Sequence, residues 1–333
     1  MATRQTFTKD ELGRYFDRIC LPKARRIYDA SQLDDQQKLA FLNLMQKHHL
    51  CKCPWENIVQ HYSWHKTVYL RPSHLFQKIV GNPGRGGYCF ENNFFYHLIL
   101  RSLGFPAYMC PSRVYKQGAG SYGGLTHVVN IIPLAGKKYL LDGGFGGQGP
   151  ICAVPLEHGA EVTQIAPAQI RLMFEAIPNF VDPAQKCWVF QYRHNAASPW
   201  TPMYCFVEFE CTPDDVQSMN FSPWLSRSSF FAHKVVCVRF TTDREKNDAD
   251  GPGSPGEAEL EGEIDGHMTI NNDVVKWRRR GEKVVDVPFE KDQDRVDAFR
   301  KYYGIILSEE EQDSVKGTAA MIAGGAMGAD GDS

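Results

Sequence analysis

The sequence predicts an α+β protein, because helical patterns, strand patterns and a mixed region follow one another along its 333 residues. Apolar residues recur at helical spacing over the first hundred residues, whereas the middle third consists of short β-rich runs bounded by Gly or Pro. The last third contains both patterns. Segregated helices and strands of this kind are typical of α+β folds, and the length predicts more than one domain.

The N-terminal third carries clear helix signals. Thr8 and Glu11 form a capping box in front of an amphipathic helical pattern. A second helical pattern covers residues 36–49 and ends before Pro54, which cannot continue a helix. A short helix over residues 75–80 follows.

The middle of the chain changes to the strand pattern. We expect strands at 108–114, 126–132, 138–142, 169–174, 188–192 and 204–210. Later, strands are expected at 234–241 and 283–287, and a helix at 292–303. The segment 246–263 is rich in Asp, Gly, Pro and Glu and predicts a flexible surface loop. The Gly/Ala-rich end predicts a loose tail.

Composition excludes several classes of protein. The formal net charge is -2, with 37 Lys and Arg against 39 Asp and Glu, so the chain lacks the general basic surface of a nucleic-acid-binding protein. No apolar run is long enough to span a membrane, and the first residues lack the apolar core of a secretory signal. Ten scattered cysteines without a C-x-x-C pair indicate free thiols in a reducing compartment, so we expect a cytoplasmic protein.

The densest chemical signal is the run from Arg85 to Asn93, which contains Gly86, Gly87 and Cys89. The two glycines allow a sharp turn and a close approach of the backbone to a ligand. A helical pattern follows and stops at Gly104. Cys89 is therefore expected at a helix N-terminus, where unpaired N–H groups and the helix dipole lower the pKa of a thiol.

Two further residues complete a possible nucleophilic site. His127 lies in a strand pattern 38 residues after Cys89, and Asp142 follows 15 residues later at the end of the next strand pattern. A turn at Ala135-Gly136 would place both on adjacent strands. A thiol nucleophile, a base and a carboxylate that orients the base are the three groups that cysteine-dependent acyl transfer requires.

Each of these residues also has a plain structural explanation. A free cysteine at a helix start is often a small buried apolar residue. A strand histidine is often only hydrogen-bonded, and an aspartate before two glycines often forms a turn. Their occurrence together, in the Arg-Gly-Gly-Tyr-Cys context, favours the catalytic interpretation.

Residues 85–91, Arg-Gly-Gly-Tyr-Cys-Phe-Glu, resemble the signature Arg-Gly-Gly-aromatic-Cys-apolar-Glu of the arylamine N-acetyltransferases. Other segments resemble further family motifs in the same order: Pro54-Trp55-Glu56-Asn57, Thr126-His127, Leu141-Asp142-Gly143-Gly144-Phe145-Gly146, Val154-Pro155-Leu156-Glu157, Ser228-Ser229-Phe230 and Tyr303-Gly304-Ile305-Ile306-Leu307. The resemblance covers roughly residues 8 to 310 and is highly specific. The composition of the acidic loop and of the Gly/Ala-rich end most resembles that of fungal members of the family. Trp55, Gly143 and Gly147 depart from the usual pattern, which leaves pocket size and amine selectivity open.

The resemblance implies a cysteine-protease-like architecture of three domains. A helical domain over 1–105 would carry Cys89, a β-barrel domain over 106–225 would carry His127 and Asp142, and an α/β lid would cover 226–310. Residues 311–333 would form a flexible tail.

The implied activity is acyl transfer through an acyl-cysteine, with Cys89, His127 and Asp142 as catalytic residues and ping-pong kinetics. Acetyl-CoA would be the acyl donor and co-substrate, an arylamine, arylhydrazine or arylhydroxylamine the acceptor, and no cofactor would be tightly bound. The alternative within the family is an N-malonyltransferase that uses malonyl-CoA, for which Arg113 or Arg227 could supply a cation. A thiol peptidase or transglutaminase-like acyltransferase is less favoured, because the 38-residue spacing is far shorter than in papain-like enzymes.

Binding residues can also be named. Arg227, Ser228 and Ser229 are candidates for coenzyme A binding, and Phe145 is the candidate for the amine pocket. The basic run 276–280 is interpreted as a solvated strand end rather than as a phosphate site. His48, His49, Cys51 and Cys53 lack a second ligand pair at zinc spacing, so no metal site is expected.

Overall fold

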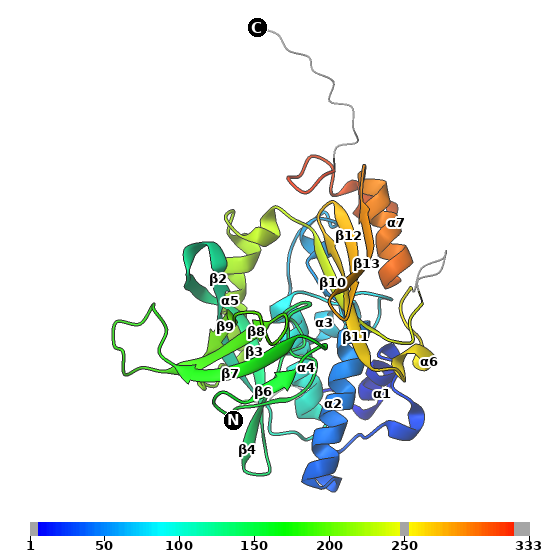
Figure 1. Ribbon diagram of the computed structural model, residues 1–333. Helices are drawn as coiled ribbons and strands as arrows, with labels where there is room; N and C mark the ends of the chain where they lie inside the picture. Colours follow the sequence, from blue (N-terminus) through cyan, green and yellow to red (C-terminus); the bar gives the residue numbers. More distant parts are fainter. Residues whose placement is uncertain (1–5, 247–252, 323–333) are drawn as a thin grey trace.

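The structure of the chain is a computed structural model that describes residues 6–246 and 253–322. It has an α+β fold with helices at the N-terminal end, an eight-stranded sheet and a separate five-stranded sheet (Figure 1). The predicted fold class is confirmed. In Figure 1 the helices α2 and α4 lie between the two sheets, where α4 packs against β3 and α2 packs against β10.

The N-terminal helices begin and end close to where the sequence predicts. They are α1 (Lys9–Arg18), α2 (Asp35–Lys52), α3 (Pro72–Ile79) and α4 (Cys89–Ser102), with short 3-10 turns at Lys23–Arg25, Ala30–Gln32 and Ile58–Gln60. The capping box of Thr8 and Glu11 is present at the start of α1, as expected. Asp34 and Gln37 form a second capping box at the start of α2.

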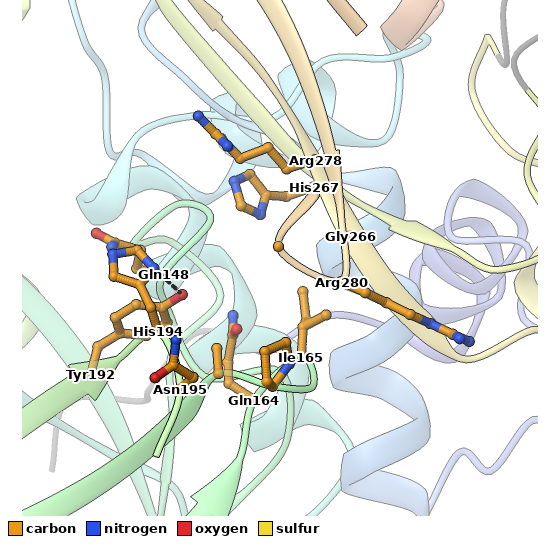
Figure 2. A pocket seen from close by; sticks show the side chains of 13 residues that line it. Gln148, Gln164, Ile165, Tyr192, His194, Asn195, Gly266, His267, Arg278 and Arg280 are labelled. Atoms are coloured by element: carbon orange, nitrogen blue, oxygen red, sulfur yellow. Dashed lines mark hydrogen bonds between the residues drawn. The ribbon is translucent and has the colours of Figure 1, made fainter. Parts of the chain in front are cut away.

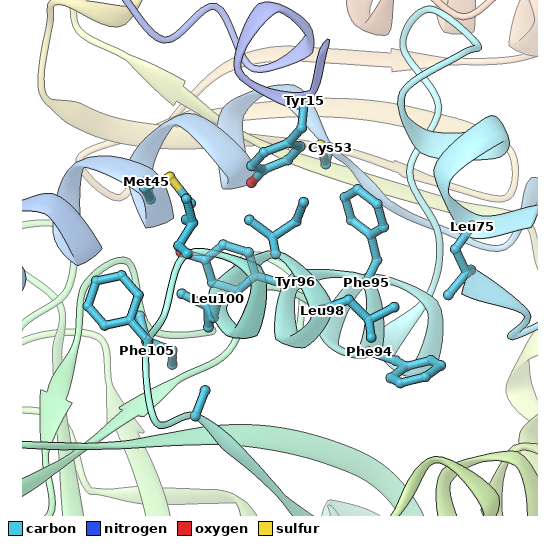
Figure 3. Packing of buried hydrophobic residues seen from close by; sticks show 14 of the residues in the cluster. Tyr15, Met45, Cys53, Leu75, Phe94, Phe95, Tyr96, Leu98, Leu100 and Phe105 are labelled. Carbon is cyan, nitrogen blue, oxygen red and sulfur yellow. The ribbon is translucent and has the colours of Figure 1, made fainter. Parts of the chain in front are cut away.

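Helix α4 is buried along almost its whole length. Residues from α1, α2 and α3 surround it in one apolar cluster, which Figure 3 shows around Phe95 and Tyr96. Both of these side chains are fully buried. A helix packed on all sides is held firmly, so the backbone that carries Cys89 at its first turn is fixed in position.

The eight-stranded sheet is antiparallel and forms a nearly closed barrel. Its strands are β2 (Tyr108–Lys116), β3 (Ser121–Leu134), β4 (Lys137–Leu141), β5 (Val154–Pro155), β6 (Glu161–Thr163), β7 (Gln169–Glu175), β8 (Cys187–Arg193) and β9 (Thr201–Phe206), in the order β5-β4-β3-β2-β9-β8-β7-β6. Ala135 and Gly136 both adopt positive φ in the turn between β3 and β4. This hairpin places Asn130 opposite Leu141 and so brings His127 and Asp142 to neighbouring strands.

The five-stranded sheet has the order β1-β10-β11-β12-β13 and combines distant parts of the chain. Its strands are β1 (Trp55–Glu56), β10 (Val236–Thr242), β11 (Ile264–Asn271), β12 (Val274–Arg279) and β13 (Glu282–Pro288). Helix α7 (Asp292–Tyr303) covers one face, where Phe299 and Trp277 share a buried cluster. Helix α5 (Pro213–Leu225) and a 3-10 turn (Phe230–Ala232) connect the two sheets.

Two segments pack more closely than their composition predicts. Within the expected loop 246–263, helix α6 (Glu257–Leu260) buries Leu260. Within the expected tail, helix α8 (Glu309–Asp313) is followed by the buried residues Val315 and Ala320, which join the core beneath α7. The remainder of both segments, 247–252 and 323–333, lies outside the described residues.

Candidate active site

Cys89 is the first residue of α4 and lines a cavity of about 530 Å³. Its side chain is buried, and its Sγ lies 3.5 Å from the carbonyl oxygen of Thr126 on β3. Gly86 lets the loop before the helix pass directly over the carbonyl of Pro54, since a Cβ there would lie 2.0 Å from that oxygen. The loop and the helix together present the thiol to the cavity.

His127 and Asp142 meet beside this cavity. His127 lines the same cavity as Cys89, and its Nε2 lies 2.8 Å from Oδ2 of Asp142. Because the carboxylate can only accept a hydrogen bond, Nε2 carries the proton and the neutral ring has its lone pair on Nδ1. The structure therefore places Cys89 and His127 on one cavity and joins Asp142 to His127, so it brings together the three residues that the sequence singles out.

Asp142 is held by a second set of hydrogen bonds, which the sequence motifs do not indicate. Its Oδ1 accepts from Asn93 Nδ2 and from the Gly144 amide, both at 2.9 Å. Burial alone would raise the pKa of Asp142, but His127 and these two donors lower it below its usual value. Asn93 lies four residues after Cys89, on the same side of α4, and that helical spacing is the signal that could have identified it.

The Cys89 thiol is in the opposite electrostatic situation. Burial and the charge of Asp142 raise its pKa, while the N–H groups of Phe90 and of Cys89 itself act to lower it. The expectation that the helix N-terminus gives a lowered pKa is therefore wrong for the thiol taken alone, because desolvation outweighs the helix. A reactive thiolate at this position requires that the proton moves to His127, so that the two charges form together.

Aromatic rings form one wall of the cavity. The ring of Phe145 lies 5.3 Å from that of His127 and 4.8 Å from that of Tyr204, between ring centroids. Phe145 lines the cavity, as expected for a residue of the amine pocket, whereas Tyr204 on β9 is fully buried behind it. A planar aromatic acceptor would find apolar surface here.

The other end of the cavity is polar. Ser226, Ser228 and Ser229 line it together with Lys116. The hydroxyls of Ser226 and Ser228 are hydrogen-bonded to each other at 2.9 Å. Arg227 is exposed and is not among the lining residues, and Arg113 donates to the carbonyl of Gly123 instead. Lys116, which the sequence analysis did not select, supplies the positive charge at this end.

A buried group of charges supports the loop in front of Cys89. Arg85 Nε lies 3.0 Å from Glu56 Oε1 in a buried ion pair. Lys78 Nζ lies 2.7 Å from Glu91 Oε1 and 3.6 Å from Glu56 Oε1. The other oxygen of Glu91 accepts from the Tyr88 amide. Two acids and two bases thus hold the residues on either side of the nucleophile.

Within the described part of the chain, no cluster of three or more His, Cys, Asp or Glu side chains could hold a metal ion. His48 instead contacts the carbonyl of Ile19, and His49 the hydroxyl of Tyr15. Across the same residues, no helix is long and apolar enough to cross a membrane.

The fold and the site together define a class: an α+β protein in which a helix-start cysteine faces a histidine–aspartate pair on a β-hairpin. Comparison with known proteins identifies the family. The family model described as N-acetyltransferase matches residues 38–247. The "N-malonyltransferase FDB2" of Gibberella moniliformis is 30% identical over 338 residues, covering 94% of this chain and 93% of that protein.

Some further relatives match only part of the chain, and several solved structures share its fold. The "Arylamine N-acetyltransferase / N-hydroxyarylamine O-acetyltransferase" of Salmonella typhimurium is 30% identical over 191 residues, 57% of this chain and 62% of its own. Among solved structures, the arylamine N-acetyltransferase from Salmonella typhimurium superposes with a TM-score of 0.72 at 22% identity, covering 93% of this chain and 98% of that one. A Mycobacterium marinum arylamine N-acetyltransferase, solved in complex with CoA, has a TM-score of 0.69 at 22% identity, with 90% and 96% covered. The chain belongs to the arylamine N-acetyltransferase family and is an acyltransferase.

Proposed function

We propose that the protein transfers a malonyl group from malonyl-CoA to an arylamine through an acyl-cysteine at Cys89. The observation that carries this proposal is the placement of Cys89 and His127 on one cavity, with Asp142 hydrogen-bonded to His127. The choice of acyl group is supported by the similarity to N-malonyltransferase FDB2, which extends over 94% of the chain. The motifs alone imply acetyl as the first choice of acyl group, whereas similarity along nearly the whole chain favours the malonyl alternative.

In the first half-reaction, Nδ1 of His127 takes the thiol proton of Cys89 as its sulfur attacks the thioester carbon of the donor. We assign the N–H groups at the start of α4 as donors to the negative oxygen that forms. The tetrahedral intermediate expels the coenzyme A sulfur, which receives the proton from His127. One thioester replaces another, so this exchange is nearly balanced in energy.

In the second half-reaction, the arylamine nitrogen attacks the acyl-cysteine. His127 takes the amine proton, Asp142 stabilises the imidazolium, and collapse of the intermediate returns Cys89 with formation of an amide. Phe145 provides apolar surface for the aromatic ring of the amine. Both half-reactions use one site, so ping-pong kinetics are expected.

The anionic parts of the donor require positive or hydrogen-bonding partners. Ser228, Ser229 and Lys116 line the polar end of the cavity, and Arg227 lies exposed next to Ser228 in the chain. We assign donor binding to this end, with Lys116 as the residue that meets a carboxylate or a phosphate.

A competition experiment tests the proposal. The protein is mixed with equal concentrations of malonyl-CoA and acetyl-CoA, and the intact mass and the modified peptide are determined. A malonyl group on the peptide containing Cys89 is the expected result. A predominantly acetyl adduct would show that the protein transfers an acetyl group and would overturn the choice of malonyl. Absence of both adducts, together with hydrolysis of peptide substrates, would instead support the thiol peptidase alternative.

A further inference from the structure

A second cavity, of about 550 Å³, lies between the eight-stranded and the five-stranded sheets. We call it the intersheet cleft. Its lining includes Gln148, Gln164, Tyr192, His194, His267 and Arg278, which Figure 2 shows around an open centre. It shares no lining residue with the cavity of Cys89. Its volume falls within the roughly 300–1,000 Å³ that is usual for small-molecule sites.

The charged side chains that line the intersheet cleft are all basic. Two arginines and two histidines are among its lining residues, and no Asp or Glu is. Within the described residues, Arg278 has no carboxylate within 4.0 Å, whereas its neighbour Arg279 is paired with Asp265 at 2.8 Å. Figure 2 shows Arg278 beside His267, while Arg280 points away from the centre of the cleft. Arg278 is therefore a cation of the site that has no ion-pair partner within 4.0 Å in the described part of the chain, and an acid that its charge acts on is Asp286 of β13.

Strand alternation explains why the basic run 276–280 divides in this way. Successive side chains of β12 point to opposite faces of the sheet. Trp277 is buried beneath α7, so Lys276 and Arg278 lie on the opposite face, where both also line a smaller adjoining cavity with His267. Arg278 is exposed, as expected for a solvated strand end, and it also lines the intersheet cleft.

His267 adds a neutral donor to the positive charge. Burial and the nearby Arg278 lower the pKa of His267 to about 4, so its ring is uncharged at neutral pH. The ring packs against Gly147, where a Cβ would lie 2.5 Å from a ring carbon. Gln164 donates to the carbonyls of Gly147 and Gly149 at 3.1 Å and 3.0 Å, which fixes the loop beside the cleft.

We propose that the intersheet cleft binds the phosphate groups of a phosphate-bearing ligand, with Arg278 as the principal contact. A guanidinium offers two parallel N–H donors that match phosphate geometry, and His194 and His267 line the same cleft as further donors. The phosphate belongs either to the nucleotide end of a coenzyme A or to a free phosphorylated molecule, since both present the same chemistry.

Calorimetric titration of the full chain with inorganic pyrophosphate tests the proposal. Wild-type protein is expected to bind, more weakly as salt increases. Arg278→Ala should weaken binding at least tenfold and Arg278→Lys less. Arg300→Ala removes an exposed arginine from α7, on the other side of the same sheet, and should leave binding unchanged. Absence of binding by the wild type, or equal binding by wild type and Arg278→Ala, overturns the proposal.

A second titration identifies the source of the phosphate. If saturating coenzyme A prevents pyrophosphate binding, the nucleotide end of coenzyme A occupies the cleft. If pyrophosphate still binds, the natural ligand is a separate molecule. Acylation of Cys89 by malonyl-pantetheine, which contains no phosphate, is measured in parallel. Its failure would count against the proposed function and not against the intersheet cleft.

Discussion

Asn93 donates a hydrogen bond from Nδ2 to Oδ1 of Asp142 over 2.9 Å, so the helix that begins with Cys89 also holds the carboxylate partner of His127. The same amide group donates to the carbonyl of Val128 and accepts from the Gly143 amide. One side chain thereby connects α4, β3 and the loop after β4. The relative position of the three proposed catalytic residues depends on it.

Asn93→Ala should slow acylation of Cys89 about tenfold or more, because a hydrogen bond to a charged group contributes about 1.5–3 kcal/mol. Loss of the donor also raises the pKa of Asp142, so the acidic limb of the pH–rate profile should move to higher pH. Asn43→Ala, which removes a hydrogen bond to the Ala153 amide instead, is the matched control. A slower Asn93→Ala enzyme with an unshifted profile would show that Asn93 acts only through stability.

Cys89→Ala should prevent formation of any acyl adduct, since no other thiol lines the cavity within the described residues. Intact-protein mass spectrometry after mixing with the donor measures this directly. Cys152→Ala removes a partly exposed thiol from another cavity and should acylate like the wild type. An adduct on the Cys89→Ala protein would refute the assignment of the nucleophile.

Asp142→Asn should reduce the single-turnover rate by about 10³–10⁴, in line with the effect of the same change in a Ser-His-Asp triad. The amide keeps the size of the side chain but can donate to Nε2 of His127, which moves the ring proton to Nδ1. The base would then have no lone pair for the thiol. Stopped-flow acylation of Cys89 gives the rate, and a loss smaller than tenfold contradicts the proposed orientation of His127.

Lys116→Ala should raise the KM for the acyl-CoA donor about three- to tenfold with little change in kcat. Lys116 lines the polar end of the cavity, whereas Arg227 is exposed outside it, so Arg227→Ala should have a smaller effect on the same constant. Initial-rate kinetics at fixed amine concentration separate the two. Equal effects of the two variants would instead indicate that the donor contacts both Lys116 and Arg227.

The buried carboxylate of Glu56 makes the free energy of unfolding depend on pH. Burial opposes its charge, but Arg85 and Lys78 lower its pKa to about 2, against about 4.3 for an unfolded glutamate. The stabilisation it provides is therefore complete above about pH 5 and is lost as the pH falls toward 2. Urea unfolding at several pH values should show this decline in the wild type and a lower, flatter curve for Glu56→Gln. Glu157→Gln, at an exposed pair with Lys137, should follow the wild type.

The sequence predicts the parts of this site that depend on local order. The glycines before Cys89, the helical pattern after it and the β3–β4 hairpin are all encoded within a few residues of one another. The capping box at Thr8 and the limits of α7 follow for the same reason. These features can be predicted without knowing which distant segments of the chain are in contact.

The remaining features depend on tertiary packing. Asn93 is important because it donates to Asp142, and Tyr204 because its ring packs against His127 and Phe145. Lys116 is important because strand β2 ends at the cavity. The sequence does not predict strands β11 and β12. In a run such as 276–280, the side chains that face the core can be told from those that face solvent only when the position of α7 is known. The direction of the Cys89 pKa shift was missed because burial cannot be estimated from a helix start alone.

The pairing of Trp55 with Val238 in β1 and β10 has a consequence for the order of assembly. These partners are 183 residues apart, so strand β1, which also bridges to Gly87 of the Arg-Gly-Gly turn, has no sheet to join until most of the polypeptide has left the ribosome. Closing such a long loop is slow compared with forming the local helices. A nascent chain therefore acquires its reactive sulfur environment late, after the segments that enclose it have been synthesised.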